Sequence, residues 1–341
     1  MRLLDLRNGG KHLPRQARLD VPGSLHHVLV RGIERRRIVD DDKDRGDFVN
    51  RLGGIASDTG TIIYAWSLLT NHAHLLLRSS EIGISRYMRR LLTGYAIRYN
   101  KRHSRHGHLF QNRYKSIICE EETYFLELVR YIHLNPLRAR LVEDMVGLEH
   151  YRWCGHGVIL NRRKHEWQNC DYVLSRFGKT RKSARTAYRA FVCEGAGQGN
   201  RPELVGGGLI RSLGGWFEVK ALRKSGERER YDERILGSGD FVQRMIEESS
   251  GPVRRQFSDV ERREQITRLV NDECRKEKVN IKELRSGSRR RPVAQIRKKL
   301  IRLLVEEEGV TLAEAARQLG ISTSAVGKSL SRQLGGSHAS Q

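Results

Sequence analysis

The segment TIIYAWSLLTNHAHLLLR (61–78) contains two runs rich in β-branched, aromatic and aliphatic residues. Such runs are typical of strands, and the Thr70-Asn71 pair between them predicts a tight hairpin that joins a strand at 61–69 to a strand at 72–78. Strands joined by a tight hairpin run antiparallel. The segment therefore predicts part of an antiparallel sheet.

Strand-type and helix-type runs alternate on both sides of this hairpin. The expected elements are strands at 25–31 and 114–119 and helices at 40–57, 84–101 and 121–135. The last helix should stop before Pro136, because the residue before a proline disfavours the helical conformation. Strands interleaved with helices predict an α+β fold, in which an antiparallel sheet has helices packed on one or both faces.

The rest of the chain has weaker strand signals. We expect three units, at 13–145, 146–238 and 239–334, of which the second is a partly helical linker or uncharacterised region with a Gly-rich loop at 195–215. The third unit is helical. Its segment TLAEAARQLGISTSAVGKSLS (311–331) has the layout of a helix-turn-helix, with Gly320 at the turn and Ser322 as cap of the second helix.

The composition is strongly basic. The 341 residues include 64 Lys and Arg against 40 Asp and Glu, for a formal net charge of +24. Basic side chains that neutralise phosphates release condensed counterions, so nucleic acid is the expected partner. A membrane surface is a weaker alternative, because no apolar run approaches the roughly 20 residues of a membrane span. With no signal-peptide pattern and five scattered cysteines, we expect a cytoplasmic, nucleoid-associated protein without disulfides.

His72 and His74 are the first candidates for chemistry. Alternate residues of a strand share one face, so both imidazoles point the same way and are able to bind one metal ion. Two histidines packed on a sheet face are the commoner explanation of a bare His-x-His pattern. The motif alone therefore does not predict a metal site.

Tyr131 and Asn135 are the second pair of candidates. They are four residues apart on a predicted helix and so lie on one face, about one turn from each other. Tyr131 also continues an apolar stripe with Tyr124 and Leu128, so it equally fits a core position. Asn135 equally fits a helix cap before proline.

The combination of the two pairs favours chemistry. Two imidazoles and an amide oxygen make an incomplete ligand set for a divalent cation, with positions left for water or a phosphate oxygen. A tyrosine one turn from the amide ligand would reach the same phosphate. A phenol needs such help as a nucleophile, because it is largely protonated at neutral pH and the phosphate is anionic.

Four blocks resemble a known family. They are PGSLHHVLVRG (22–32), NHAHLLL (71–77), GHLFQNRYKS (107–116) and YIHLNPLRARLV (131–142). In this order they are similar to the single-tyrosine HUH transposases, and specifically to the REP-associated tyrosine transposases. The resemblance implies a ferredoxin-like HUH sandwich, with His72, His74 and Asn135 as ligands of Mg²⁺ or Mn²⁺ and Tyr131 as nucleophile. Ala73 is smaller than the family's usual residue and should face away from the metal.

The resemblance also implies a reaction and a substrate. Tyr131 would cut single-stranded DNA beside imperfect hairpins, through a 5′-phosphotyrosine intermediate, and rejoining would follow without external energy. Arg31, Arg113 and Lys115 lie in matched blocks and would contact the DNA backbone, although a solvated basic surface explains each of them equally well. The active form would be a monomer or a homodimer. A domesticated, non-cleaving DNA-binding regulator is the alternative, and an RNA-binding protein is a remote third.

The segment 286–332 resembles the helix-turn-helix domain of the bacterial replication initiator DnaA. The resemblance rests on GSRRRPVAQIRKKLIRLL (287–304) and on the turn at 311–322. It implies that duplex DNA binds through a basic loop and a recognition helix, whose candidate residues are Arg289, Arg290, Arg291, Thr323, Ser324 and Lys328. The initiator's signature at that helix is absent, so its sequence specificity is not expected here. A helical interaction module with a basic face is the alternative.

Two further groups are less promising. Cys154, His156, His165 and Cys170 have a spacing that fits no common zinc motif. Tyr95 and Tyr99 are also one turn apart on a basic helix, but no ligand-type side chain accompanies them. Base stacking or core packing is the expected role of these two tyrosines.

Overall fold

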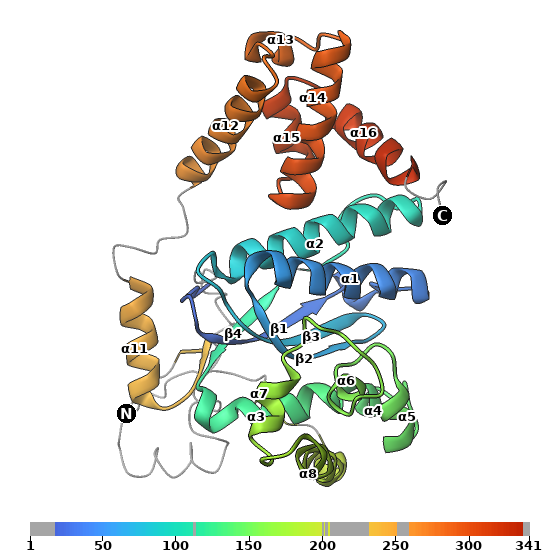
Figure 1. The fold of residues 1–341 in the computed structure, drawn as a ribbon, viewed down its shortest axis with the longest axis vertical. Coiled ribbons are helices and arrows are strands. Elements are labelled where there is room, and N and C mark those ends of the chain that lie inside the picture. Colours follow the sequence, from blue (N-terminus) through green and yellow to red (C-terminus); the bar gives the residue numbers. More distant parts are fainter. Residues whose placement is uncertain are drawn as a thin grey trace, which may run out of the picture.

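The computed structural model describes residues 18–111, 114–199, 201, 204, 232–250 and 259–336. A five-stranded sheet in the order β2-β3-β1-β4-β5 lies at its centre (Figure 1). The strands are β1 (Leu25–Arg31), β2 (Ile62–Leu68), β3 (His72–Arg78), β4 (Lys115–Cys119) and β5 (Ile235–Leu236). The first four pair antiparallel, as the sequence predicted, whereas β5 adds a short parallel pair at the β4 edge. Within the described residues, no helix is long and apolar enough to cross a membrane.

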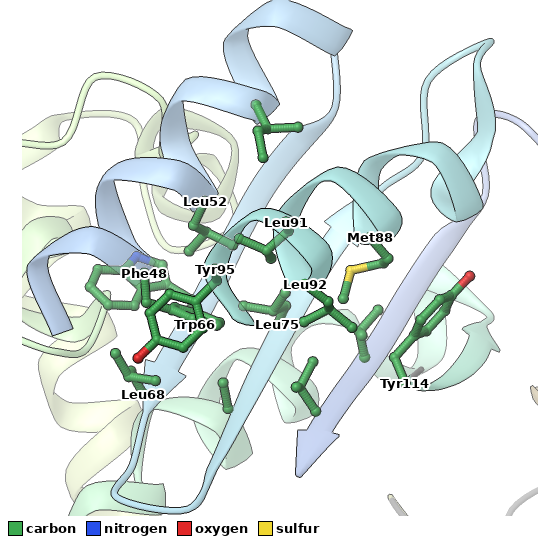
Figure 2. Close-up of a cluster of buried hydrophobic side chains, with 14 of the residues drawn as sticks. Phe48, Leu52, Trp66, Leu68, Leu75, Met88, Leu91, Leu92, Tyr95 and Tyr114 are labelled. Carbon is green, nitrogen blue, oxygen red and sulfur yellow. The ribbon is translucent and has the colours of Figure 1, made fainter. Parts of the chain in front are cut away.

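Two helices cover one face of the sheet. They are α1 (Asp42–Thr59) and α2 (Gly83–Arg102), which lie side by side above the strands in Figure 1. Their apolar residues pack with alternate residues of the strands, and Figure 2 shows part of this core around Phe48, Trp66, Leu75 and Tyr95. Tyr95 and Tyr99 are buried here, so these two tyrosines are core residues. Helices interleaved with strands confirm the α+β prediction.

The opposite face is covered by α3 (Glu121–His133) and by helices that follow it. These are α4 (Asn135–Arg138), α5 (Met145–His150), α6 (His156–Ile159), α7 (Cys170–Ser175) and α8 (Arg181–Glu194), followed by a 3₁₀ turn at Ala196–Gln198. Leu148, Ile159 and Tyr188 share one buried cluster with Leu128 of α3. Much of the stretch 146–238, for which the sequence predicted only partial helix, therefore completes the core of this face. Most of the Gly-rich segment 195–215 lies outside the described residues.

The end of α3 differs from the prediction. A helix was expected over 121–135, but α3 ends at His133 and a new helical turn, α4, begins at Asn135 with Pro136 in its first turn. Pro136 has no amide hydrogen to continue the helical ladder, yet its fixed φ suits a first turn. The proline thus breaks the helix and restarts it, and Asn135 lies at the junction.

The C-terminal part of the chain is helical. Its elements are α11 (Gly239–Ser250), α12 (Asp259–Lys276), α13 (Ile281–Arg285), α14 (Arg291–Arg302), a π-turn at Leu303–Glu307, α15 (Leu312–Leu319) and α16 (Thr323–Gly336). Gly320 adopts a left-handed φ of 65° between α15 and α16. The elements from α12 to α16 share a separate core. This unit contacts α2, where Arg86 pairs with Glu308 at 2.7 Å. It therefore lies on the α1–α2 side of the sheet, and α3 lies on the other side (Figure 1).

Candidate active site

The pairing of β1 with β3 places the two predicted histidines beside Arg31. Across the sheet, His72 is opposite Arg31 and His74 is opposite Leu29. His74 and Leu76 face α3, whereas Ala73 is fully buried against α1 and α2. Ala73 thus faces away from the two imidazoles, as predicted. Because residues opposite each other share a face, the guanidinium of Arg31 is on the imidazole side of the sheet.

Helix α3 brings Tyr131 onto the same face. The ring of Tyr131 meets the ring of His74 edge to face, with centroids 5.7 Å apart, and the rings of His72 and His74 have centroids 5.3 Å apart. Tyr131 is 8% exposed, so it is packed but not sealed from solvent. Residues that are 57 positions apart in the sequence therefore meet at one point of the sheet surface.

Asn135 lies one turn beyond Tyr131. Its side-chain amide donates to the Tyr131 carbonyl, in the last turn of α3, at 3.2 Å. That bond uses the nitrogen of the amide and leaves the oxygen as the group able to bind a cation. This hydrogen bond and the ligand role of Asn135 are therefore compatible.

A third histidine, His27, joins the site from β1. Its Nε2 lies 3.0 Å from Nδ1 of His74, the two rings are stacked, and its ring also meets the edge of Tyr131 at 5.9 Å. His27 is a site residue that was not predicted from the sequence. Side chains alternate between the two faces of β1, so His27 and Arg31, four residues apart, share a face. This spacing was the available indication that His27 lies on the same side of the sheet as Arg31.

Arg138 and Asn71 are the other residues that the sequence analysis missed. Arg138 places its guanidinium over the Tyr131 ring, 5.2 Å from the centroid. Asn71, in the β2–β3 turn, lies with its side-chain oxygen 2.7 Å from Nδ1 of His72. Both residues lie inside sequence blocks that carry the family resemblance, and this position was the only indication in the sequence that they belong to the site.

The site's electrostatics favour neutral imidazoles. Burial lowers the pKa of His72 to about 4, with a further contribution from Arg31. Burial also holds the pKa of His74 well below its usual range, helped by the neighbouring His27, His72 and Arg31. A neutral imidazole with a free lone pair is the form that binds a metal ion.

The donor set fits a divalent cation. Nδ1 of His72 and Nδ1 of His74 are both engaged in hydrogen bonds, so Nε2 is the available nitrogen of each ring. Together with the Asn135 oxygen they make nitrogen and oxygen donors without a thiolate, a combination that suits Mn²⁺ and, less strongly, Mg²⁺. The residues present thus fit the metal that the resemblance implies.

The remaining predicted DNA contacts are spread over the molecule. Lys115 is exposed on β4 and follows His74 and Leu29 in one row across the sheet, so its Cα lies about 10 Å from that of His74. Arg113 lies outside the described residues. The predicted DNA contacts of the C-terminal unit are all exposed; they are Arg289, Arg290, Arg291, Thr323, Ser324 and Lys328. Arg290 also forms an ion pair with Glu283, at 3.0 Å.

The four candidate zinc residues do not assemble into a site in the part of the chain that the structure describes. Cys154 is buried with its thiol 3.7 Å from the His133 carbonyl, His156 forms a hydrogen bond with Tyr188, and the ring of His165 packs against Trp167 in a tilted arrangement.

A cluster of Asp40, Asp44 and His103 has ligand-type atoms within 4.8 Å of one another. The guanidinium of Arg102 already contacts this cluster, 2.5 Å from a carboxylate oxygen of Asp44. The hydroxyl of Tyr99 also donates to Asp40. These groups join the start of α1 to the end of α2, and Arg102 supplies the positive charge that a metal would bring. The cluster is an ion-pair network between two helices.

Comparison with known proteins finds a similarity that covers the N-terminal part of the chain. Residues 21–135 match the model of the IS200-like transposase family. The matched span contains His72, His74, Tyr131 and Asn135, the residues that surround the candidate site. No curated protein matches the chain. A similar solved structure, described as "Structure of the REP associates tyrosine transposase bound to a REP hairpin", is 13% identical, covers 46% of this chain and 98% of that chain, and has a TM-score of 0.37.

Proposed function

We propose that this protein cleaves and rejoins single-stranded DNA beside hairpins, with Tyr131 as the nucleophile. The observation that carries the proposal is the edge-to-face contact of the Tyr131 ring with the buried imidazole of His74, whose ring lies beside that of His72. The family match over residues 21–135 supports a transposase, and the net charge of +24 supports a nucleic-acid substrate.

The proposed reaction is a balanced transesterification. The phenolic oxygen of Tyr131 attacks the phosphorus of a phosphodiester, a new P–O bond forms to the tyrosine, and the bond to the 3′ oxygen breaks. The proton that leaves the phenol is balanced by the proton that the 3′ oxygen takes up. One ester bond replaces another, so the free 3′-OH is able to reverse the step.

The residues around Tyr131 have distinct proposed roles. His72, His74 and Asn135 would hold Mg²⁺ or Mn²⁺, which neutralises charge on the phosphate when it is bound. Arg31 adds a positive charge beside His72 and would bind the DNA backbone, as would Lys115 and Arg113. The order β1-α1-β2-β3-α2-β4, with β1 and β3 central, is the layout of the ferredoxin-like sandwich that we propose for this unit.

We assign duplex binding to the C-terminal unit. Its α15 and α16 are joined by a turn at Gly320, and the exposed Thr323, Ser324 and Lys328 lie on the first two turns of α16. This helix would enter the major groove, and Arg289–Arg291 would bind phosphates. Because this unit rests on α2, it would hold the protein to duplex DNA on the side away from Tyr131.

The test incubates the full chain with Mn²⁺ and labelled single-stranded hairpins from the DNA that flanks its gene. A denaturing gel then detects a covalent protein–DNA adduct. We expect an adduct with the parent and none with Tyr131→Phe or His74→Ala. Tyr124→Phe, on the same helix two turns earlier, is the matched control and should retain the adduct. Chelation of the metal should abolish it.

Two outcomes would favour another function. Tight hairpin binding without any adduct would support the non-cleaving regulator. Equal or tighter binding of the same hairpin as RNA would support the RNA-binding alternative. Gel filtration with and without the hairpin decides between a monomer and a homodimer.

A further inference from the structure

We propose that Asn71 and His27 fix the tautomers of His72 and His74, so that both rings present Nε2 as the free lone pair. The inference deepens the proposed function, because it names the residues that prepare the metal ligands before any metal arrives. Neither residue is itself a metal ligand. Both are positioning residues that act through a hydrogen bond to Nδ1.

The orientation of Asn71 is determined by its other contact. Its side-chain nitrogen donates to the backbone carbonyl of Arg35 at 2.9 Å. The side-chain oxygen therefore faces Nδ1 of His72, at 2.7 Å. An amide oxygen only accepts, so Nδ1 of His72 must carry the hydrogen. In neutral imidazole this leaves the lone pair on Nε2.

The loop that supplies the Arg35 carbonyl is strained. Glu34 and Arg35 have φ values of 52° and 59°, in the left-handed region that non-glycine residues rarely adopt. Backbone strain of this kind persists where the surrounding contacts enforce it, and it is common at functional sites. Here the amide of Gly32 donates to the Asn71 carbonyl at 2.9 Å, which ties the strained loop to the β2–β3 turn.

His27 plays the corresponding part for His74. The two rings share one hydrogen between Nε2 of His27 and Nδ1 of His74, 3.0 Å apart, and both residues are at most 4% exposed. When His74 donates that hydrogen, its Nε2 bears the lone pair; when His27 donates it, Nε2 of His74 is protonated and cannot bind a metal. We assign the first arrangement, because only this one leaves Nε2 of His74 with a lone pair for the metal ion of the proposed function.

The neighbouring His26 shows the difference between a structural and a positioning histidine. Its two ring nitrogens each lie 2.9 Å from a serine hydroxyl, of Ser24 and of Ser116, on the other face of β1. It therefore contacts neither ligand histidine. His26 offers a control of the same residue type, on the same strand and equally buried.

The experiment measures the tautomers directly. Metal-free full chain is labelled with ¹⁵N-histidine, and the His72 and His74 resonances are assigned with His72→Gln and His74→Gln. We expect both parent rings as the Nδ1–H tautomer. His27→Phe should convert His74 to a mixture or to the Nε2–H form, and Asn71→Leu should do the same for His72. His27→Gln, whose side-chain oxygen is able to accept the same hydrogen, should restore His74, whereas His26→Gln should change neither ring.

Calorimetric titration with Mn²⁺ gives the second readout. Loss of a partner that orients a metal-binding histidine typically weakens metal affinity about 10- to 100-fold, and we expect this for His27→Phe and Asn71→Leu. Unchanged tautomers in both variants would overturn the inference. A parent that forms the expected tautomers but no DNA adduct would leave the inference standing and reject the proposed cleavage, so the two failures are distinguishable.

Discussion

The guanidinium of Arg138 lies over the ring of Tyr131, with its Cζ 5.2 Å from the ring centroid, and its Nη1 donates to the Tyr131 carbonyl at 3.3 Å. The same carbonyl accepts from Asn135. Arg138 therefore holds both the backbone and the ring of the proposed nucleophile. A cation over the face of an aromatic ring also stabilises the packed ring by about 0.5–2 kcal/mol.

Arg138→Met should slow adduct formation without unfolding the protein. Methionine keeps much of the apolar stem but loses the carbonyl bond and the charge above the ring, so Tyr131 becomes less well positioned. A misplacement of about 1 Å at a reacting group costs on the order of 100-fold in rate, and we expect a loss of about 10- to 100-fold. Single-turnover gel assays at saturating hairpin measure it. Arg140→Met, two residues away and exposed, is the control, and equal rates for the two variants would contradict the role of Arg138.

Tyr188→Phe should destabilise the layer that contains α3. The Tyr188 hydroxyl lies between Nδ1 of His133 at 2.7 Å and Nδ1 of His156 at 2.8 Å, and all three side chains are buried. Phenylalanine would leave both nitrogens without this partner, at a cost of about 1–3 kcal/mol for each buried group. Urea denaturation should show a larger loss than for Tyr151→Phe, at a half-buried tyrosine. A loss no greater than in that control would contradict the role assigned to the hydroxyl.

Stability should fall as the pH is lowered from about 6.5 towards 4. Burial lowers the pKa of His156 to about 4, and it does the same for His26. In the unfolded chain these histidines take up protons near pH 6.5, so between the two values the unfolded state binds more protons and is favoured. Each group contributes at most about 1.4 kcal/mol per pH unit. His156→Gln should reduce the slope of unfolding free energy against pH, and exposed His108→Gln should not; identical slopes in all three proteins would refute this.

Gly309→Ala should loosen the C-terminal unit from α2. A Cβ at Gly309 would lie 2.9 Å from Cγ of Arg89 and 3.0 Å from the amide nitrogen of Arg90. Gly309 has a φ of 62°, and Gly287, with a φ of 78° and no atom within 4 Å of its Cβ position, is a control with similar backbone strain. We expect faster amide hydrogen exchange in α2 for Gly309→Ala only. Equal exchange in both variants would mean that this contact does not hold the two parts together.

The sequence predicted the sheet well because its patterns are local. β1 and β3 begin and end where expected, since their strand-type runs are bounded locally, by Gly32 after β1 and by the Thr70-Asn71 turn before β3. Side chains alternate between the two faces of a strand, so the sequence also predicted that Ala73 faces away from His72 and His74. The break at His133 was not predicted in detail, because Pro136 is compatible both with a helix stop and with a new first turn.

The contacts that complete the candidate site depend on tertiary structure. His27 reaches His74 only through the register of β1 against β3, and the sequence contains no local signal for that register. Likewise, the packing of α5 to α8 under the sheet depends on buried residues such as Tyr188, whose partners are 32 and 55 positions away. The sequence of α2 is strongly basic, yet two of its arginines, Arg86 and Arg98, pair with Glu308 and Glu306 of the C-terminal unit.

Mass spectrometry of the covalent adduct identifies the tyrosine that is joined to the DNA. The full chain is trapped with Mn²⁺ and the hairpin substrate, digested with nuclease and trypsin, and searched for a nucleotide phosphate attached to tyrosine. The peptide Tyr131–Arg138 (YIHLNPLR) contains a single tyrosine, so its fragment ions assign the site without ambiguity. We predict the added phosphate on Tyr131 of this peptide. A phosphotyrosyl nucleotide on Tyr95, Tyr99 or any other tyrosine, with Tyr131 unmodified, would contradict the account.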